Sequence, residues 1–246
     1  MSESSKQDTT NGGSPLLRRQ ALFEVPIWSA DLDSVLPYHA EMAGEAHDLI
    51  DRETSLNEGR VLAHQSVTDP FSLPSPGWKQ LEAETHKRYA ELARTQFQRW
   101  RAGEFHIRRW VIRLGMLNAE EKTRLRRDQI HNHLPALFST IYYLRIPAEI
   151  TGAGGGTRFW NPIGNLMDVT APRLCDVPAR EGRLVIFPSF VDHAPIPVEW
   201  DTAGDSRLVV SSDLFYVSGR AATIDPRTVV VAGRDADKHS PSATEA

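Results

Sequence analysis

Three histidines stand in settings that suit a metal site. His131 and His133 flank a single asparagine shortly before the strand-like run that begins at Phe138, and His193 directly follows the pattern of a second such run. In an extended segment, residues two apart lie on the same face about 6–7 Å apart, so the first two imidazoles can converge on one ion. A third imidazole from a distant strand would complete a facial set. Divalent iron accepts imidazole nitrogens, and three ligands leave room for oxygen and a chelating co-substrate.

The segments that must position these histidines are short and rich in β-forming residues. They follow Gly103 and are mostly separated by proline and glycine, which is typical of a sandwich or barrel and not of alternating βαβ units. The strands that the sequence predicts are His106–Arg113, Ser139–Ile146, Thr157–Trp160, Arg183–Phe187, Arg207–Val217 and Thr228–Ala232.

Two helices are predicted before this β-rich part. The first runs from Ser34, with Pro37 in its first turn, and carries apolar residues at helical spacing. The second has Ser75 as N-cap and Pro76 as first helical residue. Its apolar stripe comprises Leu81, Tyr89, Leu92, Ala93, Phe97 and Trp100. We therefore expect an α+β chain with a mainly β core and N-terminal helices packed on it.

Several motifs together resemble the 2-oxoglutarate/Fe(II)-dependent dioxygenases of bacteria and phages. That family has His-x-His, then Ser-Gly-Val-Tyr-Tyr, a glycine-bounded strand, Phe-Pro-Ser-x-x-x-His and a later arginine. The corresponding runs here are His131–His133, Ser139–Tyr143, Gly155–Phe159, Gly182–His193 and Arg207. The resemblance covers about residues 105–217. It implies a double-stranded β-helix (a jelly-roll, cupin-like fold), with His131 and His193 as metal ligands and with Tyr143 and Arg207 binding the distal carboxylate of 2-oxoglutarate. A guanidinium fork and a phenol hydroxyl suit that carboxylate chemically.

The sequence departs from related oxygenases at one ligand. Many of them carry His-x-Asp, whereas the corresponding position here is His133. Either His133 is the third ligand, which gives a face of three neutral imidazoles, or a carboxylate from elsewhere replaces it. Asp128 and Asp192 are the nearest candidates, although neither has the required spacing. We favour His133 as the ligand.

The function expected from the resemblance is Fe(II)- and 2-oxoglutarate-dependent oxidation by O2. The substrate would be an unidentified small or carrier-bound molecule, and hydroxylation of a C–H bond is favoured over desaturation or cyclisation. Two alternatives stay open: a cupin-type three-histidine metalloenzyme that does not use 2-oxoglutarate, and a non-catalytic jelly-roll binding module. A small basic cluster precedes His131: Arg124, Arg126 and Arg127. It is compatible with recognition of an acidic substrate, but we favour the interpretation that it is a solvent-exposed loop.

Composition bounds the remaining expectations. The chain has 246 residues, 40% of them hydrophobic and 24% charged, which is ordinary for a soluble protein. We expect one domain over residues 19–235 between disordered tails at 1–18 and 236–246. The net charge of −4 argues against nucleic acid as partner. No apolar run in the sequence is long enough to predict a membrane span. With one cysteine, Cys175, a cytoplasmic location is expected, and a homodimer is left open.

Other residues with reactive or aromatic side chains fit a structural interpretation better. The glycine run 152–156 lacks the Lys-Ser/Thr of a phosphate-binding loop and is expected to be a turn that leads into a strand. Cys175 has no histidine or acidic setting that would make it a nucleophile. A role as pocket walls is open for four aromatic residues, but on short strands we interpret them as core: Trp110, Phe138, Phe159 and Trp160.

Overall fold

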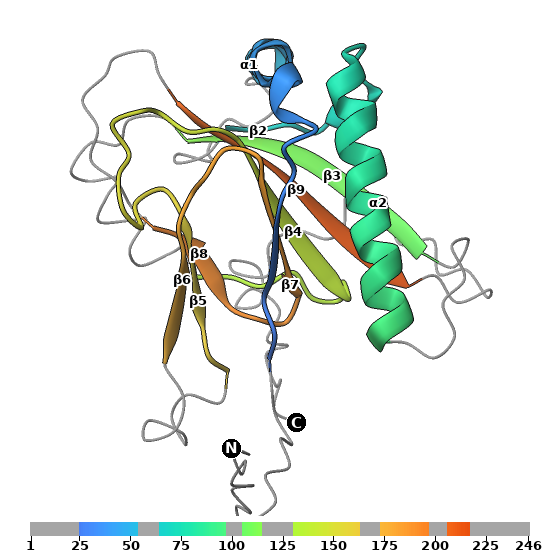
Figure 1. The fold of residues 1–246 in the computed structure, drawn as a ribbon, viewed down its shortest axis with the longest axis vertical. Coiled ribbons are helices and arrows are strands. Elements are labelled where there is room, and N and C mark those ends of the chain that lie inside the picture. The colour runs from blue at the N-terminus through green and yellow to red at the C-terminus, as the bar shows by residue number, and fades with distance from the viewer. Residues whose placement is uncertain are drawn as a thin grey trace, which may run out of the picture.

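A computed structural model describes residues 25–53, 64–96, 105–114, 130–162, 173–196 and 206–216 of the chain. Two antiparallel sheets and two α-helices make up most of these residues (Figure 1). The strands are β1 (Trp28–Asp31), β2 (His64–Gln65), β3 (Phe105–Leu114), β4 (Phe138–Arg145), β5 (Thr157–Trp160), β6 (Leu174–Val177), β7 (Arg183–Pro188), β8 (His193–Pro195) and β9 (Arg207–Tyr216). The helices are α1 (His39–Glu53) and α2 (Pro76–Gln96), with 3-10 turns at Leu36–Tyr38 and Pro70–Ser72.

The larger sheet has six strands in the order β1-β7-β4-β9-β3-β2. Its central strand β4 pairs with β7 on one side and with β9 on the other, so that Ser139 lies opposite both Phe187 and Asp213. Residues far apart in the sequence therefore meet in the middle of this sheet.

Both helices cover one face of the larger sheet (Figure 1). Met42 and Ile50 of α1 and Trp78 and Leu81 of α2 are almost completely buried. They pack in one cluster with alternate residues of the sheet strands, including Tyr142. Burial of large apolar side chains of this kind stabilises a fold by roughly 1.5–3 kcal/mol each.

The smaller sheet, β6-β5-β8, lies against the opposite face of the larger one (Figure 1). A second buried cluster fills the space between the sheets: Ile141, Tyr143, Phe159, Val185, Phe187, Val191 and Val209. Strand alternation explains the two clusters, because successive side chains of β4 point to opposite faces. The helix-covered face is closed by apolar packing, whereas the face toward the smaller sheet also carries histidine, arginine and aspartate side chains.

The predicted mainly antiparallel β core with two helices is confirmed. Ser75 caps α2 as expected, since its Oγ accepts a hydrogen bond from the Gly77 amide at 3.2 Å. The glycine run forms turns before β5, with positive φ at Gly152 and Gly155. The first helix begins later than the sequence pattern indicates: Pro37 lies in a 3-10 turn, and α1 begins at His39.

Four short strands are not predicted by the sequence: β1, β2, β6 and β8. The predicted strand Thr228–Ala232, both predicted tails and the end of the apolar stripe at Phe97 and Trp100 lie outside the described residues. Within the described part of the chain, neither α1 nor α2 is both long and apolar enough to cross a membrane.

Candidate metal centre

Backbone pairing brings His131, His133 and His193 together. His131 and His193 form an isolated antiparallel bridge, in which each amide donates to the other's carbonyl, at 3.1 and 2.9 Å. His133 is held nearby because its amide donates to the carbonyl oxygen of Ser189 at 2.8 Å. The segment before β4 is thereby fixed against the segment that leads into β8.

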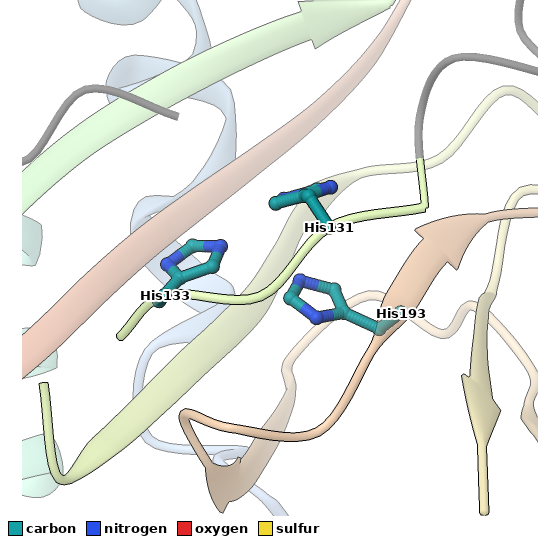
Figure 2. A group of neighbouring side chains, drawn as sticks. All are labelled: His131, His133 and His193. Atoms are coloured by element: carbon teal, nitrogen blue, oxygen red, sulfur yellow. The ribbon is translucent and has the colours of Figure 1, made fainter. Parts of the chain in front are cut away.

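The imidazoles of these residues form one compact cluster (Figure 2). Each offers a ring nitrogen, and the three nitrogens all lie within 4.8 Å of one another. The ring centroid of His131 lies 5.1 Å from that of His133 and 4.5 Å from that of His193. Among the described residues, this is the only group of three or more histidine, cysteine or acidic side chains with the geometry to hold a metal ion.

Hydrogen bonds fix how two of the rings present their nitrogens. His193 Nδ1 lies 3.1 Å from the carbonyl oxygen of Val191, and His133 Nδ1 lies 2.7 Å from Oδ1 of Asp213. Both acceptors require a proton on Nδ1, which leaves the Nε2 lone pair available as a ligand. The acceptors around the cluster therefore select the tautomer that metal binding needs.

Burial keeps His193 uncharged. Its pKa lies well below the ordinary histidine value, chiefly because burial disfavours the cation and further because His131 and His133 add positive charge nearby. A neutral imidazole is the form that binds a metal. His193 is thus suited to binding a divalent cation.

Aromatic side chains surround the cluster. Trp110 stacks on the ring of His133 at 5.7 Å, and Phe159 and Phe187 lie 5.9 and 4.6 Å from the ring of His193. Of the four aromatic residues interpreted as core, Trp110 and Phe159 contact the histidines. Phe138 instead packs edge-on against Trp28 in the cluster beneath the helices.

Arg207 and Tyr143 lie together on the same face of the larger sheet. The Arg207 guanidinium carbon is 5.3 Å from the centre of the Tyr143 ring, and Arg207 is only 3% exposed. Its Nε atom is buried without a hydrogen-bond partner, and among the described residues no carboxylate pairs with it. Burial lowers the pKa of this guanidinium, while Tyr143 acts in the opposite direction. A buried cation with an unused donor is costly unless an anion completes it.

Strand β5 contacts both Tyr143, the neighbour of Arg207, and His193 of the histidine cluster. Tyr143 OH lies 2.8 Å from Oγ1 of Thr157, and Thr157 is two residues before Phe159, which pairs in register with His193. Residues two apart on a strand are about 6–7 Å apart on one face. Thr157, which contacts Tyr143, therefore lies on the same face of β5 as Phe159, which is paired with His193.

Of the two carboxylates considered as replacements for His133, only Asp192 lies in the described part of the chain, and it does not join the cluster. Asp192 Oδ1 accepts a hydrogen bond from the Asn132 side chain at 3.0 Å and is not part of the group of converging nitrogens. Asp128 and the basic cluster at 124–127 lie outside the described residues. Cys175 is exposed on β6, and both burial and Asp176 raise the pKa of its thiol, which fits the expectation that it is not a nucleophile.

One polar residue beside the cluster, Asp213, escapes sequence-based reasoning. Asp213 is 1% exposed and accepts hydrogen bonds from His133 and from Ser139 Oγ, the latter at 2.6 Å. Ser139 in turn lies 2.8 Å from Ser189 Oγ. One signal is present in the sequence: Asp213 interrupts an otherwise apolar and hydroxyl-bearing strand, where an acidic residue needs a partner.

Comparison with known proteins gives similarity in structure but none in sequence. No family model matches the chain, and no curated protein does. A Pseudomonas putida prolyl-4-hydroxylase has a TM-score of 0.48 at 14% identity, over 79% of this chain and 94% of that one. HygX from Streptomyces hygroscopicus, with nickel and 2-oxoglutarate bound, has a TM-score of 0.47 at 11% identity, over 78% and 83%. AviO1 from Streptomyces viridochromogenes has a TM-score of 0.45 at 12% identity, over 78% and 90%.

Proposed function

We propose that this chain is an Fe(II)- and 2-oxoglutarate-dependent oxygenase built as a single domain with a double-stranded β-helix core. The observation that carries the proposal is a pairing of two features on one face of the larger sheet. One is the cluster of three converging imidazoles, and the other is the buried guanidinium of Arg207 with its unused Nε donor. A metal chelated by a 2-oxo acid would use the first, and the remote carboxylate of that acid would use the second.

The donor set fits ferrous iron. His131, His133 and His193 offer three nitrogen ligands, and imidazole suits divalent first-row metals such as iron. Three protein ligands leave coordination positions open, in contrast to the closed four-ligand shell of a structural zinc site. In this proposal His133 is the third ligand, because its Nε2 is left free by the bond to Asp213 and because neither Asp192 nor another described carboxylate joins the group.

The chemistry of Arg207 and Tyr143 supports the proposed co-substrate. A guanidinium binds a carboxylate through two parallel hydrogen bonds, and Nε is one of the donors used in that geometry. The hydroxyl of Tyr143, already next to Thr157 Oγ1, adds a further donor. A dicarboxylate bound there would neutralise a buried cation, which gives this otherwise costly residue a role.

The chain's own contribution to catalysis is positioning and exclusion of water. Iron and 2-oxoglutarate, when bound, supply the chemistry: O2 is reduced with electrons from decarboxylation to succinate and CO2 and from the substrate C–H bond, which becomes C–OH. The fixed tautomers of His133 and His193 orient the ligand nitrogens before binding. Phe159 and Phe187 wall the cluster with apolar surface, which keeps water from the open positions. An unidentified small or carrier-bound molecule is the proposed substrate.

Anaerobic reconstitution tests the proposal. Purified protein freed of metal is titrated with Fe(II), then with 2-oxoglutarate, and succinate is measured after oxygen is admitted. The proposal predicts metal binding, metal-dependent 2-oxoglutarate binding and slow succinate release even without substrate. Metal binding without any affinity for 2-oxoglutarate would indicate a three-histidine enzyme of the cupin type. Absence of metal binding would indicate a non-catalytic binding module.

A further inference from the structure

A carboxylate stands directly behind His133, the ligand at which this chain departs from His-x-Asp. Asp213 lies in the middle of β9, the strand between β4 and β3 of the larger sheet, and is 1% exposed. Its Oδ1 accepts two hydrogen bonds, one from Ser139 Oγ at 2.6 Å and one from His133 Nδ1 at 2.7 Å. An ionised carboxylate removed from water costs several kcal/mol unless such partners compensate for it. Ser139 and His133 are therefore what allows an acid in this sheet.

The same contacts immobilise His133. One ring nitrogen donates to Asp213, the ring face stacks on Trp110 with an interplanar angle of 22°, and the backbone amide donates to Ser189. With its backbone fixed and its ring held by two contacts, the side chain cannot rotate to present Nδ1 to an ion. Only Nε2 is left for a metal shared with the other two imidazoles.

Asp213 itself is not placed as a ligand. The group of converging ligand atoms comprises the three imidazoles and does not include this carboxylate. Its Oδ1 is engaged by two donors. Any effect of Asp213 on a bound ion must therefore pass through the ring of His133, as in carboxylate–histidine–metal arrangements in which the acid raises the basicity of the imidazole.

We propose that Asp213 is a positioning residue of the metal centre, which fixes the tautomer of His133 and supplies through that imidazole the negative charge that a carboxylate at position 133 would supply directly. The inference rests on the metal site of the proposed function but not on 2-oxoglutarate. The chain then contains the usual single carboxylate of an iron site, displaced one residue outward from the metal. This accounts for the departure from His-x-Asp without an uncompensated change in charge.

Metal affinity without co-substrate tests this inference. Co(II) is titrated into the metal-free full chain and into Asp213→Asn, with binding followed by calorimetry and by the visible absorption of the ion. Asparagine keeps the size and an acceptor oxygen but removes the charge. We expect Co(II) affinity to fall about 10–100-fold, the range found for such outer partners of metal-bound histidines, and the absorption band to shift. The matched control is Asp176→Asn, which removes an exposed carboxylate that pairs with Arg158 on the smaller sheet and should leave the affinity unchanged.

A second pair of variants separates this role from a merely structural one. His133→Asp alone places two carboxylates side by side in a buried site, whereas His133→Asp combined with Asp213→Asn moves the single charge onto the metal. If Asp213 acts through His133, Asp213→Asn weakens Co(II) binding in the native background and fails to weaken it, or strengthens it, in the His133→Asp background. An equal loss in both backgrounds, or no loss in the native one, overturns the inference.

The inference is also tested if the Asp213→Asn variant fails to fold. If Asp213→Asn does not fold but the double variant folds and binds Co(II), the charge has been relocated successfully and the inference stands. If neither folds, Asp213 is a structural residue and the inference falls. A native chain that binds no Co(II) would refute the metal site itself, whereas Co(II) binding without succinate formation would refute only the 2-oxoglutarate part of the proposed function.

Discussion

Replacing Arg207 by methionine should stabilise the protein and abolish co-substrate binding at the same time. Arg207 is a buried cation whose Nε has no partner, so the folded protein carries a cost that it recovers only when an anion binds. Methionine has similar length, fills irregular space and needs no hydrogen bond. The two effects have opposite signs because the residue serves binding and not folding.

The contacts of Arg207 set the expected sizes of the change in stability and of the change in 2-oxoglutarate affinity. Replacing a buried charge by an apolar side chain is neutral or stabilising by about 1–4 kcal/mol, and losing the contact with the Tyr143 ring at 5.3 Å returns about 0.5–2 kcal/mol. Taken together, the two ranges change the free energy of unfolding of the metal-free variant by between roughly −1 and +3.5 kcal/mol, and their midpoints give a gain of about 1 kcal/mol. Two charge-assisted hydrogen bonds to a carboxylate contribute about 3–6 kcal/mol, so the dissociation constant for 2-oxoglutarate should rise at least ~100-fold.

Two measurements on the native and variant proteins test both effects. Urea unfolding of the metal-free protein gives the stability, and anaerobic calorimetry of the Ni(II)-loaded protein gives the affinity for 2-oxoglutarate. Arg158→Met is the matched control, because Arg158 lies on β5 in an exposed ion pair with Asp176, where such pairs contribute only about 0–1 kcal/mol. An Arg207→Met protein that is clearly less stable and binds 2-oxoglutarate as tightly as the native chain would refute the reasoning.

Three further outcomes are expected. His193→Ala should lose tight Co(II) binding in calorimetry, whereas Asp192→Asn should keep it; loss in both would bring the carboxylate back as a ligand. Because the pKa of His193 is lowered in the folded state, the unfolded chain binds more protons below its own pKa of about 6.5. The metal-free native protein should thus lose stability as the pH falls below that value, and His193→Ala should lose less; parallel curves in chemical unfolding would contradict this. Gly156→Ala should destabilise the fold by about 1–3 kcal/mol, because an added Cβ would overlap the Val177 carbonyl oxygen; an unchanged unfolding midpoint would argue against that packing.

Much of the candidate site can be predicted from residue types and spacing. Spacing makes His131, His133 and His193 candidates, the resemblance to the dioxygenase family strengthens that choice, and the three imidazoles do converge. The reason why the imidazoles converge, however, differs in part from the one that the spacing suggests. The two-residue spacing suggests a regular strand, whereas His131 is held by an isolated bridge to His193 and His133 by Ser189. Spacing identifies the residues, and long-range backbone pairing sets their distances.

Asp213 shows why the remainder could not be predicted. It is 80 residues from His133 in the sequence, and it reaches that ring only because β9 pairs with β4 in a register that sets it opposite Ser139. A shift of one residue would turn the carboxylate to the other face of the sheet. Neither the strand order nor the register can be read from one sequence, so the acid resembles any other polar residue on a strand.

The unpredicted strands have a related explanation. Three of the four residues of β6 are exposed, so no alternation of apolar residues marks it, and β8 contains Pro195, which argues against a strand in a sequence-based prediction. Both are strands because β5 lies between them and offers its backbone on each side. Helix α2, by contrast, was predictable because its cap and its apolar stripe are local signals.

Strand β9 links the stability of the fold to the geometry of the site. Leu208, Val210 and Leu214 pack in the cluster beneath the helices, so the alternate positions, which include Arg207 and Asp213, must point toward the smaller sheet. Apolar burial on one face therefore fixes the orientation of both charges on the other, although neither charge contributes to that packing. A register slip would bury two charges under α1 and α2 and expose three apolar side chains to the space between the sheets, which hydrophobic burial strongly opposes. The buried Arg207, whose Nε has no hydrogen-bond partner, is thus held in place by residues that never touch a ligand.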